Sequence, residues 1–180
     1  MDKNLGAARV AKRSDDAESF GDLYQWGRGK DGHEQRNSPV TTTLSDSDTP
    51  GHGYFIAKPG YDRVYDWRSE QNNALWQGAN GVNNPYPEGF SVPTFSEWLA
   101  EYKTWSISTP AGAFSSILKL PAAGYRGYSS GTITGVGVYG CYWTSSTGQT
   151  KANDLYFFDQ TAILYEHERA SGFSVRCIKE

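Results

Sequence analysis

The side chains that can act as nucleophiles or bases do not fall into a catalytic motif. Serines are plentiful, and the chain has three histidines, His33, His52 and His167. None of the three stands in a pattern that would set a nucleophile beside a base and an orienting group. We therefore interpret each histidine as a surface or packed residue, and we expect that the chain is not an enzyme.

The two cysteines, Cys141 and Cys177, are too few for a disulfide scaffold and lack metal-ligand spacing. In a strand over residues 172–178, Cys177 alternates with Phe173 and Val175 and so faces the core, where a free cysteine acts as a small apolar residue. A reactive thiol needs exposed, electropositive surroundings, so a catalytic cysteine is disfavoured. Whether the two cysteines are bridged stays open at this point, because neighbouring strands can meet the required separation.

Hard oxygen ligands of the kind that calcium prefers are scattered over residues 46–84. The candidates are Asp46, Asp48, Asp62, Asp66, Asn83 and Asn84. Their spacing fits no EF-hand, and such residues more often cap turns. We expect no cofactor, while a calcium site assembled from separated loop residues remains an alternative.

A binding surface is the chemistry that the last third of the chain favours. Tyrosines there are mixed with serine and glycine, as in adaptable binding surfaces. In a hairpin over 154–167, inward Leu155, Phe157 and Leu164 would leave the intervening aromatic residues outward. The predicted ligand-binding residues are Tyr125, Arg126, Tyr128, Tyr142, Tyr156, Phe158, Tyr165, Glu166 and His167. The alternative is that some of these rings cover the second face of the sheet.

Composition narrows the class of protein. The chain has 180 residues with 6 Trp, 12 Tyr and 8 Phe, which suits one domain, residues 1–180, with an aromatic core. Its net charge of −3 disfavours a nucleic-acid partner, since phosphate binding needs a basic surface. No apolar run is long enough to insert into a membrane.

The elements that position these residues follow an α+β order. We predict helices over 15–26 and 93–102, the second with Thr94 and Glu97 as a capping box. Between them, residues 30–92 form a long loop that its aromatic residues should hold in place. Strands are predicted over 117–120, 138–146, 154–158, 161–167 and 172–178, with a hairpin turn at Asp159 and Gln160.

A series of ordered motifs resembles one known family over nearly the whole chain. The motifs are residues 2–7 (DKNLGA), 21–28 (GDLYQWGR), 84–85 (NP), 87–90 (PEGF), 92–94 (VPT), 118–121 (LKLP), 142–146 (YWTSS) and 172–177 (GFSVRC). They resemble the Fibrobacter succinogenes major paralogous domain (FISUMP), which occurs in bacterial surface proteins and phages. The chain departs from this family at Tyr86, where members usually have a cysteine, and at Cys141, where a small residue is usual. Members usually carry a tryptophan just ahead of the first motif, so we expect a fragment of a longer protein.

The resemblance implies a C-type-lectin-like fold of the formylglycine-generating-enzyme type. That fold has two helices, a small and mostly antiparallel sheet, and long ordered loops. It also pairs the first and last strands, here residues 2–7 with 172–178. Members lie in adhesins, phage tail fibres and the variable proteins of diversity-generating retroelements.

These expectations combine into one functional hypothesis with two alternatives. The leading hypothesis is an adhesin or receptor-binding module at the bacterial cell surface or on a virion. Such a module would belong to an oligomeric tail fibre or to a larger parent chain. Its ligand would be a cell-surface protein or glycan. The first alternative is a structural surface module of a secreted or lipid-anchored protein, and the second is an enzyme on the formylglycine-generating scaffold.

Overall fold

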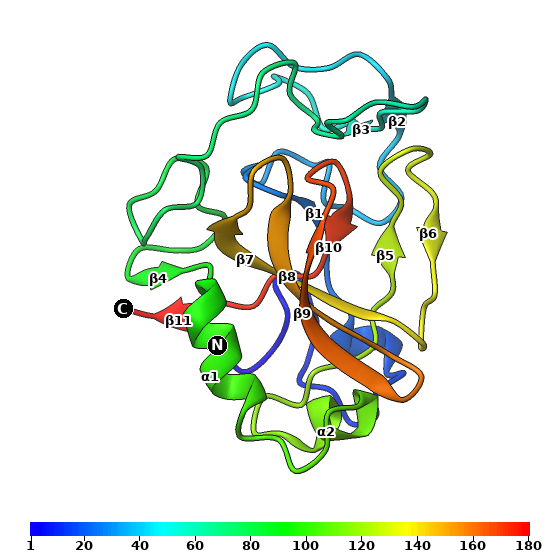
Figure 1. Cartoon of the computed structure of the whole chain (residues 1–180), viewed down its shortest axis with the longest axis vertical. Helices are drawn as coiled ribbons and strands as arrows, with labels where there is room; N and C mark the ends of the chain where they lie inside the picture. The colour runs from blue at the N-terminus through cyan, green and yellow to red at the C-terminus, as the bar shows by residue number, and fades with distance from the viewer.

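The computed structural model describes residues 1–180, and its longest strands form one sheet of three antiparallel strands. They are β7 (Gly140–Thr147), β8 (Ala152–Phe158) and β9 (Thr161–His167). The β8–β9 hairpin pairs Phe158 with Thr161 and turns at Asp159, which has a positive φ of 48°. The strands predicted over 138–146, 154–158 and 161–167 are therefore confirmed (Figure 1).

Helix α1 (Phe95–Tyr102) confirms the predicted capping box. The Thr94 hydroxyl accepts a hydrogen bond from the Glu97 amide, and the Glu97 carboxylate accepts one from the Thr94 amide. These bonds satisfy amide groups that the first helical turn leaves free. The buried Trp98 indole donates to the Trp143 carbonyl at 3.2 Å and anchors the helix to β7.

The helix predicted over 15–26 and the strand predicted over 117–120 are wrong, and one helix was not predicted. Residues 15–26 form only a 3-10 turn (Ala17–Ser19) and the short strand β1 (Tyr24–Gln25). Gly21 breaks the expected helix with a positive φ of 68°, and a Cβ there would lie 2.3 Å from the Leu5 carbonyl oxygen. Residues 117–120 form a turn after helix α2 (Pro110–Ser115), and Thr109 caps the N-terminus of this helix.

Neither α1 nor α2 is long and apolar enough to cross a membrane.

The remaining strands are two residues long and form three small sheets. Strands β1, β10, β5 and β6 make an antiparallel sheet, β11 pairs antiparallel with β4, and β2 pairs parallel with β3. Their bounds are β2 Val40–Thr41, β3 Phe55–Ile56, β4 Phe90–Ser91, β5 Tyr125–Arg126, β6 Ile133–Thr134, β10 Gly172–Phe173 and β11 Ile178–Lys179. The molecule is thus α+β with two α-helices and small, mostly antiparallel sheets.

The predicted final strand, 172–178, is interrupted. Residues 174–177 connect β10 to β11 and are all buried. The alternation of buried and exposed side chains that was expected of this segment is therefore absent. Residues 2–7 form no strand, which corrects the predicted pairing of two terminal strands. They do lie along the C-terminal segment, because the Leu5 amide donates to the Val175 carbonyl at 3.1 Å.

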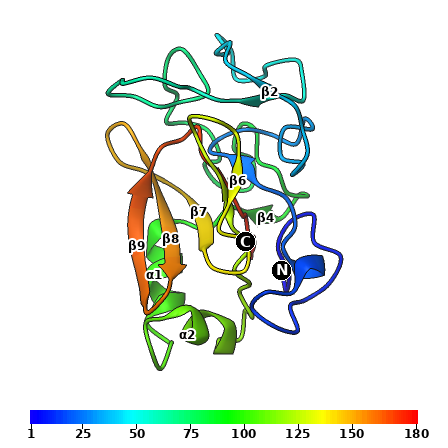
Figure 2. The same cartoon turned by 90° about the vertical axis from the view of Figure 1, so that its right-hand side faces the viewer.

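The long segment 30–92 is held in place by buried aromatic residues, as predicted. Trp67 donates its indole N–H to the Trp26 carbonyl at 2.7 Å, and Trp76 donates to the Asn83 carbonyl at 2.9 Å. Phe55 is fully buried as well. Figures 1 and 2 show much of this segment, including β2 and β3, over one end of the molecule, away from α1 and α2.

Candidate functional site

A hollow of about 150 Å³ opens between the three-stranded sheet and the sheet that contains β5 and β10. Five strands and two adjoining loops supply its walls. The lining residues are Tyr125, Tyr128, Cys141, Tyr156, His167, Glu168, Ser171 and Phe173. Four of the nine predicted ligand-binding residues, Tyr125, Tyr128, Tyr156 and His167, therefore meet at one place.

Strand alternation directs the β8 side chains as predicted. Leu155 and Phe157 are fully buried on the face that packs toward the helices. Tyr156 and Phe158 lie on the opposite face and are half-buried. Tyr165 of β9, which pairs with Asp154, shares that face and is 54% exposed.

The rings beside the hollow form a continuous aromatic surface. Tyr139 stacks on Tyr156 at 5.9 Å and on Phe158 at 5.3 Å between ring centroids. Tyr125 meets the Tyr139 ring edge-on at 5.7 Å. Such offset and edge-on contacts stabilise the rings relative to one another, so the surface is preorganised.

A carboxylate orients the histidine of the hollow. His167 Nδ1 lies 2.8 Å from Asp154 Oδ1, and its ring contacts Tyr156 and Phe173 with centroids 5.3 and 5.2 Å away. Asp154 is fully buried, and this burial raises the pKa of its carboxyl. With Nδ1 bound to Asp154, the other ring nitrogen, Nε2, has no hydrogen-bond partner within the protein.

Several hydroxyl groups at the hollow also lack a partner within the protein. They belong to Tyr125, Tyr128, Tyr156 and Ser171. Burial raises the pKa of Tyr125, of Tyr128 and of Tyr156, so these phenols stay neutral at physiological pH. A neutral hydroxyl both donates and accepts, so the hollow presents hydrogen-bonding groups of both kinds next to apolar rings.

Tyr142 and Arg126 are corrections to the predicted site. Tyr142 pairs with Leu155 in the β7–β8 ladder, which turns its ring toward the helices, and its hydroxyl donates to the Pro121 carbonyl at 2.7 Å. Arg126 is buried over the Phe55 ring and donates to Ser38 Oγ and to the Ser38 carbonyl, each at 2.6 Å. Both residues hold the fold together and are inaccessible to a ligand.

Glu166 and Phe158, both predicted to bind a ligand, do not line the hollow. Glu166 is exposed but pairs with Asn153, so it lies on the other face of β9 from Tyr165 and His167. Phe158 lies beyond the hollow, on the Tyr139 ring. Four lining residues were missed. The alternation expected over 172–178 placed Phe173 in the core, Cys141 was considered only as a reactive thiol, and no pattern singled out Glu168 or Ser171.

Three of the four carboxylates considered for calcium, all but Asp46, are engaged with other side chains. Asp48 pairs with Arg68, Asp62 pairs with Lys58, and Asp66 accepts from Gln71. These contacts favour a structural role over metal binding for the three carboxylates.

Asp31, His33 and Glu34 are the residues that come close enough together to suggest a metal site. His33 Nε2 accepts from the Gln25 amide at 3.1 Å, and His33 Nδ1 lies 2.6 Å from Asp31 Oδ1. Both ring nitrogens are therefore occupied, and a metal would have to break a buried hydrogen bond. We interpret this cluster as structural.

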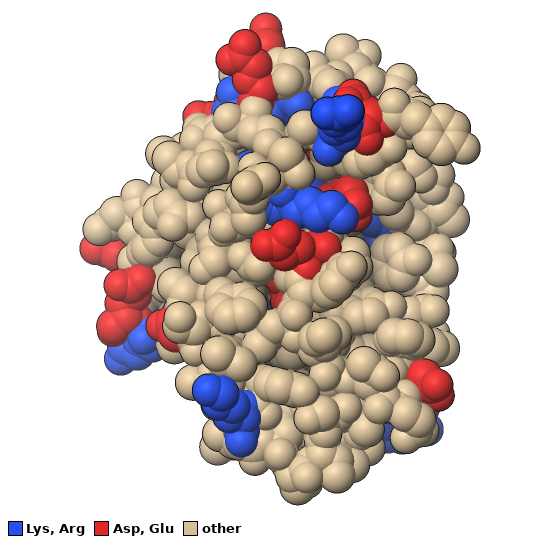
Figure 3. All heavy atoms as spheres, viewed as in Figure 1, with Lys and Arg blue, Asp and Glu red and all other residues tan.

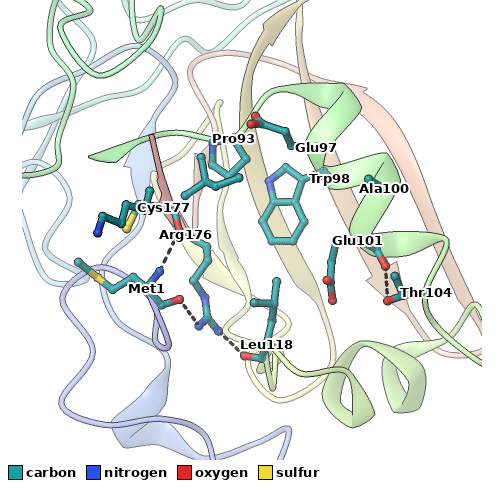
Figure 4. Close-up of a pocket in the computed structure, with 12 residues that line it drawn as sticks. Met1, Pro93, Glu97, Trp98, Ala100, Glu101, Thr104, Leu118, Arg176 and Cys177 are labelled. Atoms are coloured by element: carbon teal, nitrogen blue, oxygen red, sulfur yellow. Dashed lines mark hydrogen bonds between the residues drawn. The ribbon is translucent and has the colours of Figure 1, made fainter. Parts of the chain in front are cut away.

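A larger depression of about 470 Å³ lies between α1 and the C-terminal segment (Figure 4). Several of its polar groups are engaged within the protein, although the buried Nε of Arg176 has no hydrogen-bond partner. Arg176 donates to the Met1 and Leu118 carbonyls, Glu97 belongs to the capping box, and Glu101 accepts from the Trp105 indole. The smaller hollow, with its unpaired hydroxyl groups, is the better candidate for recognition.

Surface charge is unevenly distributed on the face that Figure 3 shows. Charged side chains gather in the upper half and the middle of this face and along its left edge, while few lie on the lower half, over the lower part of the β8–β9 hairpin and the helices. Ile163 and Tyr165 contribute exposed apolar surface to β9. Exposed apolar surface of this kind is characteristic of interaction sites.

Comparison with known proteins gives one partial match. Residues 105–178 match a family model described as a domain of unknown function, DUF8237. No curated protein and no solved structure matches the chain. All of the residues that line the smaller hollow fall within the matched segment, whereas the larger depression also uses α1, which lies outside it.

Proposed function

We propose that this chain is a ligand-binding module of the adhesin or receptor-binding kind, and that the hollow beside β8 and β9 is its binding site. The observation that carries the proposal is the group of unpaired hydroxyls and His167 Nε2 set among preorganised aromatic rings. Large rings make strong binding contacts because they desolvate much area and lose few rotamers.

The residues of the hollow favour binding over catalysis. Cys141 is buried, and burial raises the pKa of its thiol well above the usual range, which suppresses the reactive thiolate. Although His167 and Asp154 resemble the base and orienting group of a hydrolase, no hydroxyl nucleophile is hydrogen-bonded to His167. An enzyme on the formylglycine-generating scaffold is therefore disfavoured.

The finer assignments belong to the same proposal. A C-type-lectin-like fold of the FISUMP kind is supported by the ordered motifs, the α+β order and the contact of residues 2–7 with the C-terminal segment. With that fold we propose a place on the bacterial cell surface or on a virion, within a longer chain or an oligomeric fibre. The partner would be a component of a cell surface.

Staining of cells by the labelled protein tests this function. Wild-type protein, Tyr165→Ala and Tyr61→Ala would each be titrated onto a panel of bacterial cells. Tyr61 is a matched control because it is a fully exposed tyrosine that does not line the hollow. We expect Tyr165→Ala to weaken binding by about 1–2 kcal/mol, the scale of an interface anchor, and Tyr61→Ala to have no effect. Equal staining by all three proteins would leave the structural-module alternative as the better account.

A further inference from the structure

The volume of the hollow limits what part of a ligand can enter it. At about 150 Å³ it is well below the size of pockets that enclose drug-sized molecules. An engineered cavity of about this volume in another protein holds one benzene molecule. The hollow therefore matches a single six-membered ring, with the rest of the ligand outside.

The polar groups around the hollow decide which kind of ring fits. An aromatic hydrocarbon ring would cover the hydroxyls of Tyr125, Tyr156 and Ser171 and His167 Nε2 without giving them hydrogen bonds. Each group so buried costs about 1–3 kcal/mol. A saturated ring with several hydroxyl groups replaces the water on these atoms with new hydrogen bonds. It also presents C–H groups, which pack on the electron-rich faces of aromatic rings.

The charged groups around the hollow narrow the class of ligand further. No lysine or arginine lines the hollow. Its one acidic lining residue, Glu168, already pairs with Lys151 at 2.8 Å, and the buried carboxylate of Asp154 lies behind His167. An anionic ring would find no lysine or arginine in the lining to pair with, so its charge would lose water without compensation. The site therefore favours an uncharged ligand.

We infer that the hollow binds one residue of a neutral saccharide through the tyrosine and serine hydroxyls and His167, with the sugar ring packed on the aromatic wall. This inference rests on the proposed function and specifies its ligand. A protein ligand that inserts an aromatic side chain is the competing possibility, and the experiment below separates the two.

Titrations followed by amide chemical shifts provide the test. The probes are the methyl glycosides of neutral hexoses, 6-deoxyhexoses and N-acetylhexosamines, with N-acetylneuraminic acid as an anionic sugar and N-acetyltyrosinamide as a peptide aromatic. We expect saturable shifts at residues of the hollow from at least one neutral sugar. N-acetylneuraminic acid and N-acetyltyrosinamide should give none.

Variants that remove single hydroxyl groups sharpen the test. Tyr156→Phe keeps the ring and removes one hydrogen-bonding group, so sugar affinity should fall about 3- to 10-fold. Ser171→Ala should have a similar effect, whereas Tyr61→Phe, a matched change at an exposed tyrosine that does not line the hollow, should have none.

The outcomes separate this inference from the proposed function. Absence of shifts with every neutral sugar overturns the inference, and so does sugar binding that is insensitive to both Tyr156→Phe and Ser171→Ala. Binding of N-acetyltyrosinamide alone would also overturn it in favour of a protein ligand. In each of these cases, cell staining that still depends on Tyr165 would leave the proposed function standing.

Discussion

Acidification should destabilise this protein through His33 before most carboxylates are protonated. The His33 ring is completely buried and edge-on to Tyr24, with its two nitrogens bound to Gln25 and Asp31. Burial lowers the pKa of His33 from 6.5 to about 4; the hydrogen bond to Asp31 opposes this shift, and the charge of Arg28 adds to it. The folded protein therefore holds His33 neutral in a pH range where the unfolded chain protonates it.

The sign and size of the effect follow from this difference. Because the folded pKa is the lower one, the stabilisation is fully present above the unfolded value of 6.5 and is lost as pH falls toward about 4. Each pKa unit corresponds to about 1.4 kcal/mol, so the total loss is roughly 3 kcal/mol. That is a large part of the stability of an ordinary domain.

Urea unfolding of the wild type and of His33→Gln, from neutral pH down to about 4, measures this loss. The wild type should lose roughly 3 kcal/mol more than the variant across this range, since other titrating groups are common to both. His52→Gln is the control and should follow the wild type, because His52 is partly exposed. If His33→Gln does not fold, the titration of the His33 ring in the wild type can be followed by NMR. A midpoint near 6.5 would refute the reasoning.

Three further predictions concern the core, the proposed site and the thiols. Trp98→Ala should lower the free energy of unfolding by about 3–5 kcal/mol, as large-to-small changes in a core do, and urea titration would measure it. Tyr165→Ala should shift the melting temperature little, since the ring is more than half exposed; a large shift by calorimetry would mean that Tyr165 is part of the core. Cys141 and Cys177 are free and buried, so both should resist alkylation in the native protein and react after unfolding, as mass spectrometry would show.

Elements stabilised by local interactions were the ones that the sequence predicted well. The capping box of α1 lies within four consecutive residues, and the β8–β9 hairpin needs only alternation and a turn at Asp159. Tyr156 and Tyr165 were placed on the correct face for the same reason. Because successive side chains of a strand point to opposite faces, the direction of each side chain is fixed once one face is known to be buried.

The failures lie where contacts distant in sequence override local pattern. Residues 15–26 have a helical pattern, but Trp26 donates to the Thr144 carbonyl and Trp143 donates to the Tyr24 carbonyl, and these bonds hold the segment extended. Tyr142 was misplaced because β7 is buried on both faces, so alternation with solvent cannot show which way a ring points. Arg126 looked like a binding residue, since its partner Ser38 is 88 residues away in the sequence.

The central claim is that the hollow between β8–β9 and β10 is the binding surface, and oxidative footprinting tests it most directly. Protein bound to stained cells and free protein would be exposed to hydroxyl radicals, and the oxidation of each side chain compared by mass spectrometry. We predict protection of Tyr128, Tyr156 and Tyr165 in the bound state, with Tyr61 unchanged. Protection confined to residues around the larger depression, such as Met1, with Tyr156 and Tyr165 oxidised as in the free protein, would contradict the account.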